Sequence, residues 1–191
     1  MKFQHITPRR SLASRAVAAA FSLILPLTVL AATDEQKAMA NAAIDRNAEP
    51  ISVVGDSLYF YAEPGMQEFE SVKFLGETLR DMGFKVETGR AGMPTALWAT
   101  YGSGKPHIAI VTEIDALPEG SQTPGSMPRK PLVAGAPGHK EGHNTHGGVA
   151  LGALHAVKQV MDKYKLPGTI SVSFGPAEEQ LASRQIGRAH V

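Results

Sequence analysis

The sequence predicts an α/β fold with a sheet at its centre and helices packed against it. Two β-rich runs carry this prediction, at residues 107–111 (HIAIV) and 169–174 (TISVSF). The first is almost continuously apolar, as in strands that are buried on both faces, whereas the second alternates. A helical pattern that ends near Tyr164 separates them, and the order strand, helix, strand indicates an α/β arrangement.

Four further elements are expected before the first of these strands: helices over residues 34–48 and 67–82, and short strands over 84–87 and 96–100. The first helix is rich in alanine, has acids at its start and is expected to continue toward Tyr61. Asn144 or Thr145 is the expected cap of the helix that ends near Tyr164. Residues 118–137, with five prolines, form a loop of a length that is usually functional.

The first residues predict a secretory signal peptide, residues 1–31. Lys2, Arg9, Arg10 and Arg15 precede an apolar run from Ala16 to Leu30. A membrane span is the alternative, but this run is shorter than the roughly 20 residues that a spanning helix needs and contains Pro26. Arg9 and Arg10 leave a twin-arginine export route open beside the general secretory one. The expected location is therefore periplasmic or secreted.

Composition excludes several classes of function. The net charge is +1 and no basic block lies outside the predicted signal, so a nucleic-acid partner is not expected. The membrane is expected as a partner only through the signal peptide before its cleavage. The absence of cysteine excludes any thiolate nucleophile or metal ligand in these residues.

Three polar clusters follow predicted strands or precede the last long helix: Glu113 with Asp115, the loop from His139 to His146, and Glu178 with Glu179. Ligands of open α/β sheets bind beyond the carboxyl ends of the strands, so the sheet could bring these clusters to one edge.

The histidine-rich loop GHKEGHNTHGG is either a metal site or a solvated polar loop. In an extended segment His139, Glu141 and His143 point to the same side. Imidazole and carboxylate groups are ligands that zinc, manganese or iron accept. The glycines of this loop, including Gly147 and Gly148, would let the backbone approach an ion closely.

Each of the two acid pairs also has both a functional and a structural interpretation. In extended chain Glu178 and Glu179 face opposite ways, so one could bind a metal and the other could act as a general base. An exposed acidic loop is the alternative for this pair. Glu113 and Asp115 could bind metal, orient a ligating imidazole or cap a helix or loop.

Together, TEIDALPEG, PGHKEGHNTHGG and FGPAEEQ resemble the co-catalytic metal amidohydrolases of the aminoacylase/carboxypeptidase superfamily, and YAEPGMQEFES is similar to an early segment of one branch. That branch holds hippurate hydrolases, indole-acetyl-amino-acid hydrolases and p-aminobenzoyl-glutamate hydrolase. The resemblance covers Asp34 to about Arg184. It implies an α/β/α sandwich with a central mixed sheet, of which residues 32–185 would be the N-terminal part, without the lid or dimerisation domain.

The resemblance also implies roles for individual residues. Glu178 matches the catalytic acid/base, while His143 and Glu179 match metal ligands. Glu141 stands where much of this branch has a bridging cysteine, so we expect a carboxylate ligand there and two divalent ions, zinc or manganese. Asp115, His139 and His146 match orienting or flanking positions.

The implied activity is hydrolysis of a small-molecule amide, an N-acyl or aminobenzoyl amino acid or a small peptide, by metal-activated water. The alternative is a non-catalytic metal- or ligand-binding relative. The last residues, 186–191 (IGRAHV), do not resemble the family and match a translated sequencing adapter, so we expect a non-native tail on a truncated chain. Such a fragment is expected to be inactive by itself, and the full-length form is expected to be a homodimer.

Overall fold

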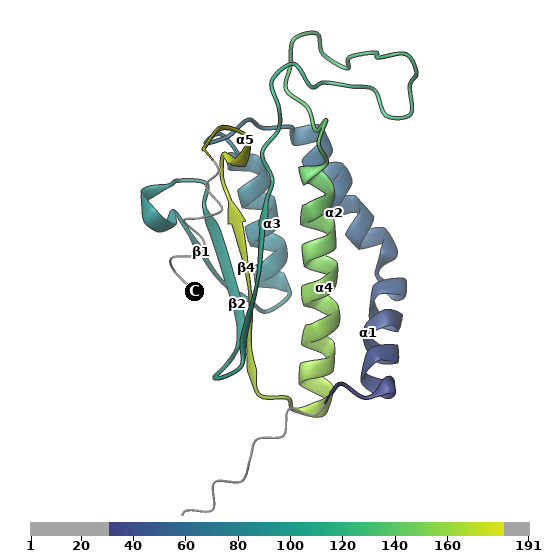
Figure 1. Ribbon diagram of the computed structural model, residues 1–191, viewed down its shortest axis with the longest axis vertical. Coiled ribbons are helices and arrows are strands. Elements are labelled where there is room, and N and C mark those ends of the chain that lie inside the picture. The colour runs from purple at the N-terminus through teal and green to yellow at the C-terminus, as the bar shows by residue number, and fades with distance from the viewer. Residues whose placement is uncertain (1–30, 182–191) are drawn as a thin grey trace, which may run out of the picture. The chain divides into compact units, whose positions relative to one another are not determined.

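The computed structural model describes residues 31–181 and confirms the α/β fold class (Figure 1). Apart from Ala31, the predicted signal peptide lies outside these residues, as does the predicted tail. The helices are α1 (Asp34–Arg46), α2 (Ala48–Tyr61), α3 (Phe69–Asp81), α4 (His143–Tyr164) and α5 (Glu178–Leu181), with a 3-10 turn η1 (Arg90–Gly92). The strands are β1 (Lys85–Thr88), β2 (Leu97–Ser103), β3 (His107–Glu113) and β4 (Gly168–Gly175).

The sheet is mixed, as the family resemblance implies, and its strand order is β1-β2-β4-β3. β2 pairs antiparallel with β1 and with β4, whereas β3 pairs parallel with β4. Because parallel strands end at the same edge, Glu113 at the end of β3 lies opposite Gly175 at the end of β4. The polar residues that follow these two strands therefore start from neighbouring positions.

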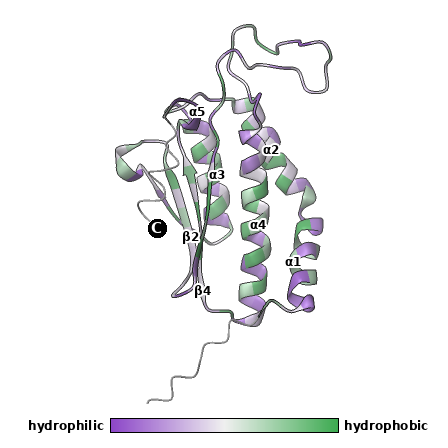
Figure 2. Ribbon diagram, viewed as in Figure 1, coloured by the Kyte–Doolittle hydropathy of each residue, from purple (hydrophilic) through white to green (hydrophobic). Residues whose placement is uncertain are grey.

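Helices α3 and α4 cover one face of this sheet, and α2 and α1 pack outside them (Figure 1). The residues of α1 are mostly hydrophilic, whereas hydrophobic and hydrophilic residues alternate along α4 (Figure 2). The buried core between helices and sheet is built mainly from Leu58, Leu75, Leu79, Leu97, Leu154, Val172 and Phe174. Among residues 31–181, no helix is long and apolar enough to cross a membrane.

The helix predicted to run from residue 34 toward Tyr61 is two helices. The break falls at Asn47, whose φ of −113° and ψ of 19° are not helical. The Asn47 side chain donates a hydrogen bond to the carbonyl of Ala43, 2.7 Å away, so it satisfies a carbonyl at the end of α1. Pro50 follows in the first turn of α2, where its missing N–H has no helical partner to lose.

The first turn of α4 differs from the sequence prediction in its cap. The N-cap is Gly142, which has a φ of 119° that favours glycine, and no side chain caps the helix. The expected caps act otherwise: Thr145 donates to the carbonyl of Gly142, and Asn144 donates to the carbonyl of Gly55 in α2. His143 consequently lies in the first turn of the helix, which fixes its backbone.

Two glycines of the histidine-rich segment allow α2 and α4 to pack closely. A Cβ on Gly147 would lie 2.3 Å from Cδ1 of Leu58, and one on Gly148 would lie 3.0 Å from the carbonyl oxygen of Ile51. From the sequence these glycines were expected to admit an ion, but the structure uses them for helix packing.

Candidate metal centre

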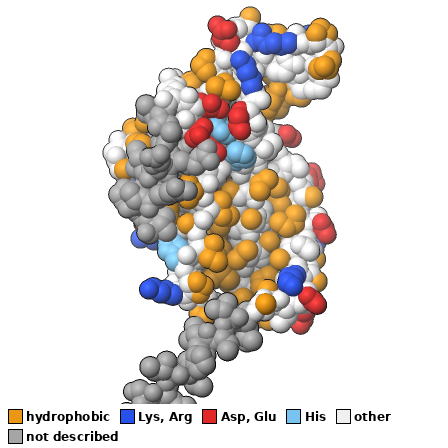
Figure 3. Space-filling model, in the orientation of Figure 1, with side chains coloured by type: hydrophobic (Ala, Val, Ile, Leu, Met, Phe, Trp, Pro, Cys, Tyr) orange, Lys and Arg blue, Asp and Glu red, His pale blue; other side chains and the backbone are white. Residues whose placement is uncertain are grey.

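The site lies where the ends of β3 and β4 meet the start of α4. Figure 3 shows acidic and histidine side chains gathered there, next to a surface area of hydrophobic side chains. Parallel pairing places Glu113 and Asp115 next to the segment that leads into α5. His143, the first residue of α4, lies close to acids of both segments. The structure thus brings all three polar clusters of the sequence to one edge of the sheet.

His143 is the centre of this cluster. It is only 2% exposed, and its Nδ1 lies 3.0 Å from the backbone carbonyl of Asp115. A carbonyl can only accept, so Nδ1 carries the proton and the Nε2 atom is directed to the acids. Nε2 lies 2.9 Å from Glu141 Oε2, 3.7 Å from Glu113 Oε1 and 3.9 Å from Glu178 Oε2.

Asp115 connects the end of β3 to both His143 and α5. Its Oδ1 lies 3.3 Å from Nδ1 of His143, while its Oδ2 accepts a hydrogen bond of 3.0 Å from the Glu179 backbone N–H. The residue is 1% exposed, so these contacts form out of water. This arrangement is what an orienting residue requires, because it fixes the ring and the neighbouring acid together.

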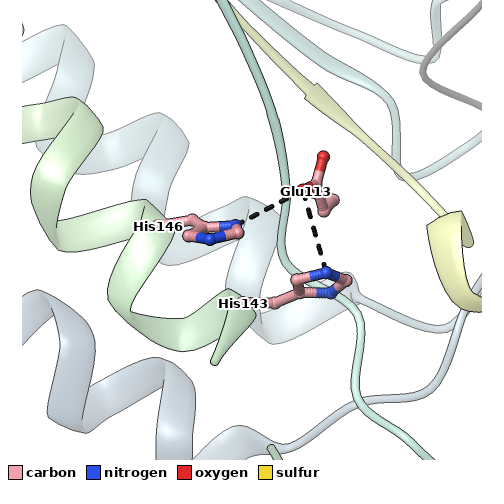
Figure 4. A group of neighbouring side chains, drawn as sticks. All are labelled: Glu113, His143 and His146. Carbon is pink, nitrogen blue, oxygen red and sulfur yellow. Dashed lines mark ion pairs between the residues drawn. The ribbon is translucent and has the colours of Figure 1, made fainter. Parts of the chain in front are cut away.

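Within residues 31–181, two groups of three side chains offer ligand atoms that lie within 4.8 Å of one another. One contains Glu141, His143 and Glu179, the three residues that the sequence predicts as metal ligands. The other contains Glu113, His143 and His146; Figure 4 shows ion pairs that join the Glu113 carboxylate to both imidazole rings. Glu113 Oε1 lies 3.3 Å from Nδ1 of His146, and the ring centroids of His143 and His146 are 5.3 Å apart.

Glu178, the predicted acid/base, lies at the margin of this cluster. It is the first residue of α5, and its carboxylate is near Nε2 of His143. Its side chain is 23% exposed, so a small molecule in the site can reach it. Glu179 follows on the same turn, with Oε1 at 3.9 Å from Nδ1 of His143.

His139 lies outside both groups. Its Nε2 is 3.1 Å from the carbonyl oxygen of Leu58 in α2, and its buried Nδ1 atom has no hydrogen-bond partner among the described residues. Burial lowers the pKa of His139 to about 4, so the ring is neutral at pH 7. The structure therefore gives His139 a contact that anchors the loop to α2.

The electrostatics of the cluster favour a positive charge at its centre. Burial opposes protonation of His143, but the hydrogen bonds of Asp115 and the negative charges of Glu141 and Asp115 outweigh it and raise the pKa of His143 to about 9. Burial raises the pKa of Glu179. Burial alone would raise the pKa of Asp115 as well, but its bonds with His143 and the Glu179 N–H bring it below its usual value.

These residues fit a divalent cation. The donor set is one imidazole nitrogen and several carboxylate oxygens, which suits a divalent metal ion. The Nδ1–H bond to Asp115 leaves Nε2 as the coordinating atom of His143, an orientation common to metal-bound histidines. Because His143 is protonated at neutral pH without a cation, binding would release its proton.

Sequence reasoning missed one residue at this edge, Glu68, which is fully buried and accepts a hydrogen bond from the N–H of Ala177. An acid before an amphipathic helix looks like a solvated residue, so no signal in the sequence identified it. Glu113, by contrast, was among the candidates from its position at the strand end.

The sequence is similar to those of a known peptidase family. The model of peptidase family M20/M25/M40 matches residues 109–190. The chain is 34% identical over 137 residues to a subunit of p-aminobenzoyl-glutamate hydrolase from Escherichia coli, a match that covers 72% of the chain and 28% of that protein. It is 35% identical over 124 residues to thermostable carboxypeptidase 1 of Saccharolobus solfataricus, covering 64% of the chain and 30% of the relative.

A solved structure supports the same assignment. A dinuclear metal-binding peptidase of the M20 family from Bacillus subtilis superposes with a TM-score of 0.55 at 25% identity, over 78% of this chain and 40% of that one. The chain thus spans about 30% of the length of the curated relatives that it matches. The matched segment and the fold identify residues 109–190 as part of a peptidase family M20/M25/M40 domain.

Proposed function

We propose that the protein is a metal-dependent amidohydrolase that cleaves the amide bond of an N-acyl or aminobenzoyl amino acid or of a small peptide. The convergence of Glu141, His143 and Glu179 beside Glu178 is the observation that carries this proposal. The relatives named above, one from a p-aminobenzoyl-glutamate hydrolase and one a carboxypeptidase, support the substrate class.

In this proposal Glu141, His143 and Glu179 hold divalent ions, zinc or manganese. Such ions would polarise the amide carbonyl and lower the pKa of a water molecule. Glu178, which is close to His143 yet partly exposed, accepts a proton from the attacking water and delivers it to the leaving amine. Asp115 keeps the ring of His143 and the backbone of Glu179 in place during these transfers.

The test is a Glu178→Gln change in the full-length enzyme, assayed on a panel of N-acyl amino acids, aminobenzoyl-glutamate and dipeptides. Hydrolysis should fall at least about a thousandfold with metal content unchanged, because general acid–base catalysis contributes about 10²–10⁴-fold and the base here serves both steps. Glu119→Gln, an exposed acid of the long loop, is the matched control. Retained turnover by the Glu178 variant would overturn the proposed role.

Failure of the unmodified enzyme to hydrolyse any substrate while it binds metal would instead identify a non-catalytic binding relative. We also propose that the protein is exported through its signal peptide and that its full-length form is a homodimer. N-terminal sequencing of the protein from the periplasm tests the first of these statements. Light scattering of the full-length protein tests the second, and a monomer would refute it.

A further inference from the structure

Glu68 is a buried acid whose side chain does not cap the helix that it precedes. It is the N-cap residue of α3, a position where a side chain commonly accepts from the free N–H groups of the first turn. Here Glu63 accepts these bonds instead, because its carboxylate lies 2.9 Å from the N–H groups of both Glu70 and Ser71. The Glu68 carboxylate is therefore free to reach elsewhere, although it is 0% exposed.

The Glu68 carboxylate reaches the turn between β4 and α5. Its Oε1 accepts a hydrogen bond of 2.8 Å from the Ala177 N–H, and its Oε2 accepts one of 2.6 Å from the Thr95 hydroxyl. Desolvation makes a buried carboxylate costly, and burial raises the pKa of Glu68. An acid kept under these conditions, with both oxygens bonded, indicates a specific structural role.

Ala177 is the residue that aims the two acids of α5. Its φ of 57° lies in the left-handed region, which is unfavourable for a residue with a Cβ, and the residue is fully buried. It directly precedes Glu178, so its backbone conformation sets the direction in which Glu178 and Glu179 leave β4. Because Pro176 has no N–H, the Ala177 amide is the first donor of this turn.

Two contacts hold the turn from opposite sides. Asp115 accepts the Glu179 N–H from the end of β3, and Glu68 accepts the Ala177 N–H from the start of α3. Gly65 packs directly on the same residue, since a Cβ there would lie 2.7 Å from both Cα and Cβ of Ala177. The Glu63 carbonyl also accepts from the Ala116 N–H at 2.9 Å, so the segment before α3 touches the ends of both strands.

We infer that Glu68 is a positioning residue for the metal centre: its carboxylate fixes the Ala177 amide and thereby aims Glu178 and Glu179 at His143. This inference rests on the proposed function for its consequence in catalysis, but its structural content stands on the contacts of Glu68 alone. Glu68 touches no residue of either candidate ligand group in the described contacts, so it acts only through the turn.

Three substitutions in the 191-residue chain separate positioning from general stability. Glu68→Met removes the acceptor, Glu68→Gln keeps one oxygen for the Ala177 N–H, and Thr95→Val removes the other partner of Glu68 while leaving Ala177 bonded. Hydrogen exchange of the amides of residues 177–180 should accelerate at least about tenfold in Glu68→Met only. Zinc affinity, measured by competition with a chelating dye, should fall roughly tenfold in the same variant, as for other residues that support metal ligands.

Gly65→Ala provides a second route if Glu68→Met does not fold, because it pushes on Ala177 with Glu68 intact, and it should weaken zinc binding in the same way. Equal zinc affinity in all variants, with unchanged exchange at 177–180, would overturn the inference. Equal losses in Glu68→Met, Glu68→Gln and Thr95→Val would overturn it too, since they would mark a merely structural residue. If the unmodified chain binds no zinc, the proposed ligand set of Glu141, His143 and Glu179 fails, while the exchange measurement still decides the role of Glu68.

Discussion

Two regions of α4, one helical turn apart, differ in their contacts: one is packed against apolar atoms and the other is surrounded by charged groups. Gly147 is packed against Leu58 of α2, in an apolar contact with no room for another atom. His143, four residues earlier, is surrounded by carboxylates, and their negative charges favour a positive charge on its ring or a bound cation. The first region thus brings apolar atoms into close contact, whereas the second region gathers charged groups.

Leu58 belongs to both regions, because its side chain packs on Gly147 and its carbonyl accepts the His139 ring. The cluster of acids is thus tied to α2 through the backbone of a residue whose side chain fills the core. The two regions can be separated experimentally by changing one and measuring the other.

The largest effect is expected for Leu58→Ala, which removes a fully buried side chain between α2 and α4. It should lower the free energy of unfolding by roughly 3 kcal/mol, within the range for buried leucines. Denaturant unfolding measures this loss. Gly147→Ala alone should also destabilise, through overpacking. In the Leu58→Ala background the added methyl group finds space, so the double variant should be no less stable than Leu58→Ala.

The next largest effect concerns the cation. Zinc at about 100 times its dissociation constant should stabilise the chain by about 3 kcal/mol, since it binds only the folded site. Thermal unfolding with zinc or with a chelator measures this difference. Glu141→Gln should reduce the zinc-dependent gain, whereas Glu119→Gln, on the exposed part of the long loop, should not. A full gain in the Glu141 variant would show that this carboxylate is not a ligand.

A smaller effect is expected from the ionisation of Glu68. Its pKa is raised in the folded state, so its contribution to stability is fully present below the unfolded value near 4.5 and is lost as pH rises through the folded pKa. Relative to Glu68→Gln, the unmodified chain should therefore lose stability as pH increases from about 4 toward 7. Urea unfolding in chelator at several pH values gives the difference. A difference independent of pH would contradict the raised pKa.

The smallest effect is expected at an exposed ion pair far from both regions. Lys85 and Glu87 lie 3.1 Å apart on β1, with side chains 80% and 44% exposed. Lys85→Gln should change the free energy of unfolding by less than about 0.5 kcal/mol, because exposed pairs contribute little. A loss comparable to that of Leu58→Ala would show that surface charge, rather than packing, dominates stability here.

Much of the architecture could be predicted from local patterns. The strand around HIAIV could be located from its nearly continuous apolar run and the strand around TISVSF from its alternation. Their connection through a helix predicted the edge at which Glu113, His143 and Glu178 meet. The ends of elements were less predictable. Asn144 was expected to cap α4, but it bonds to Gly55 of α2, and such a partner depends on packing that the local sequence does not encode.

The residues of the candidate site could also be predicted only in part. The residues that were identified follow strands or begin a helix, where exposed acids and histidines have a known meaning. Glu68 could not be identified, because its importance depends on burial beneath Ala177, a residue 109 positions later. The ligand roles of Glu141, His143 and Glu179 and the orienting roles of Asp115, His139 and His146 remain predictions, although the structure brings Glu141, His143 and Glu179 within reach of one ion.

The parallel pairing of β3 with β4 has a consequence for folding kinetics. The segment from Glu113 to Glu179 supplies every residue of both candidate ligand groups and forms one strand–helix–strand crossover. The cluster of acids is therefore assembled in one step, when β4 docks beside β3. Parallel docking of this kind is a slow, non-local step. Divalent cations present during refolding should accordingly act late, by slowing the undocking of β4 rather than by accelerating the formation of α4.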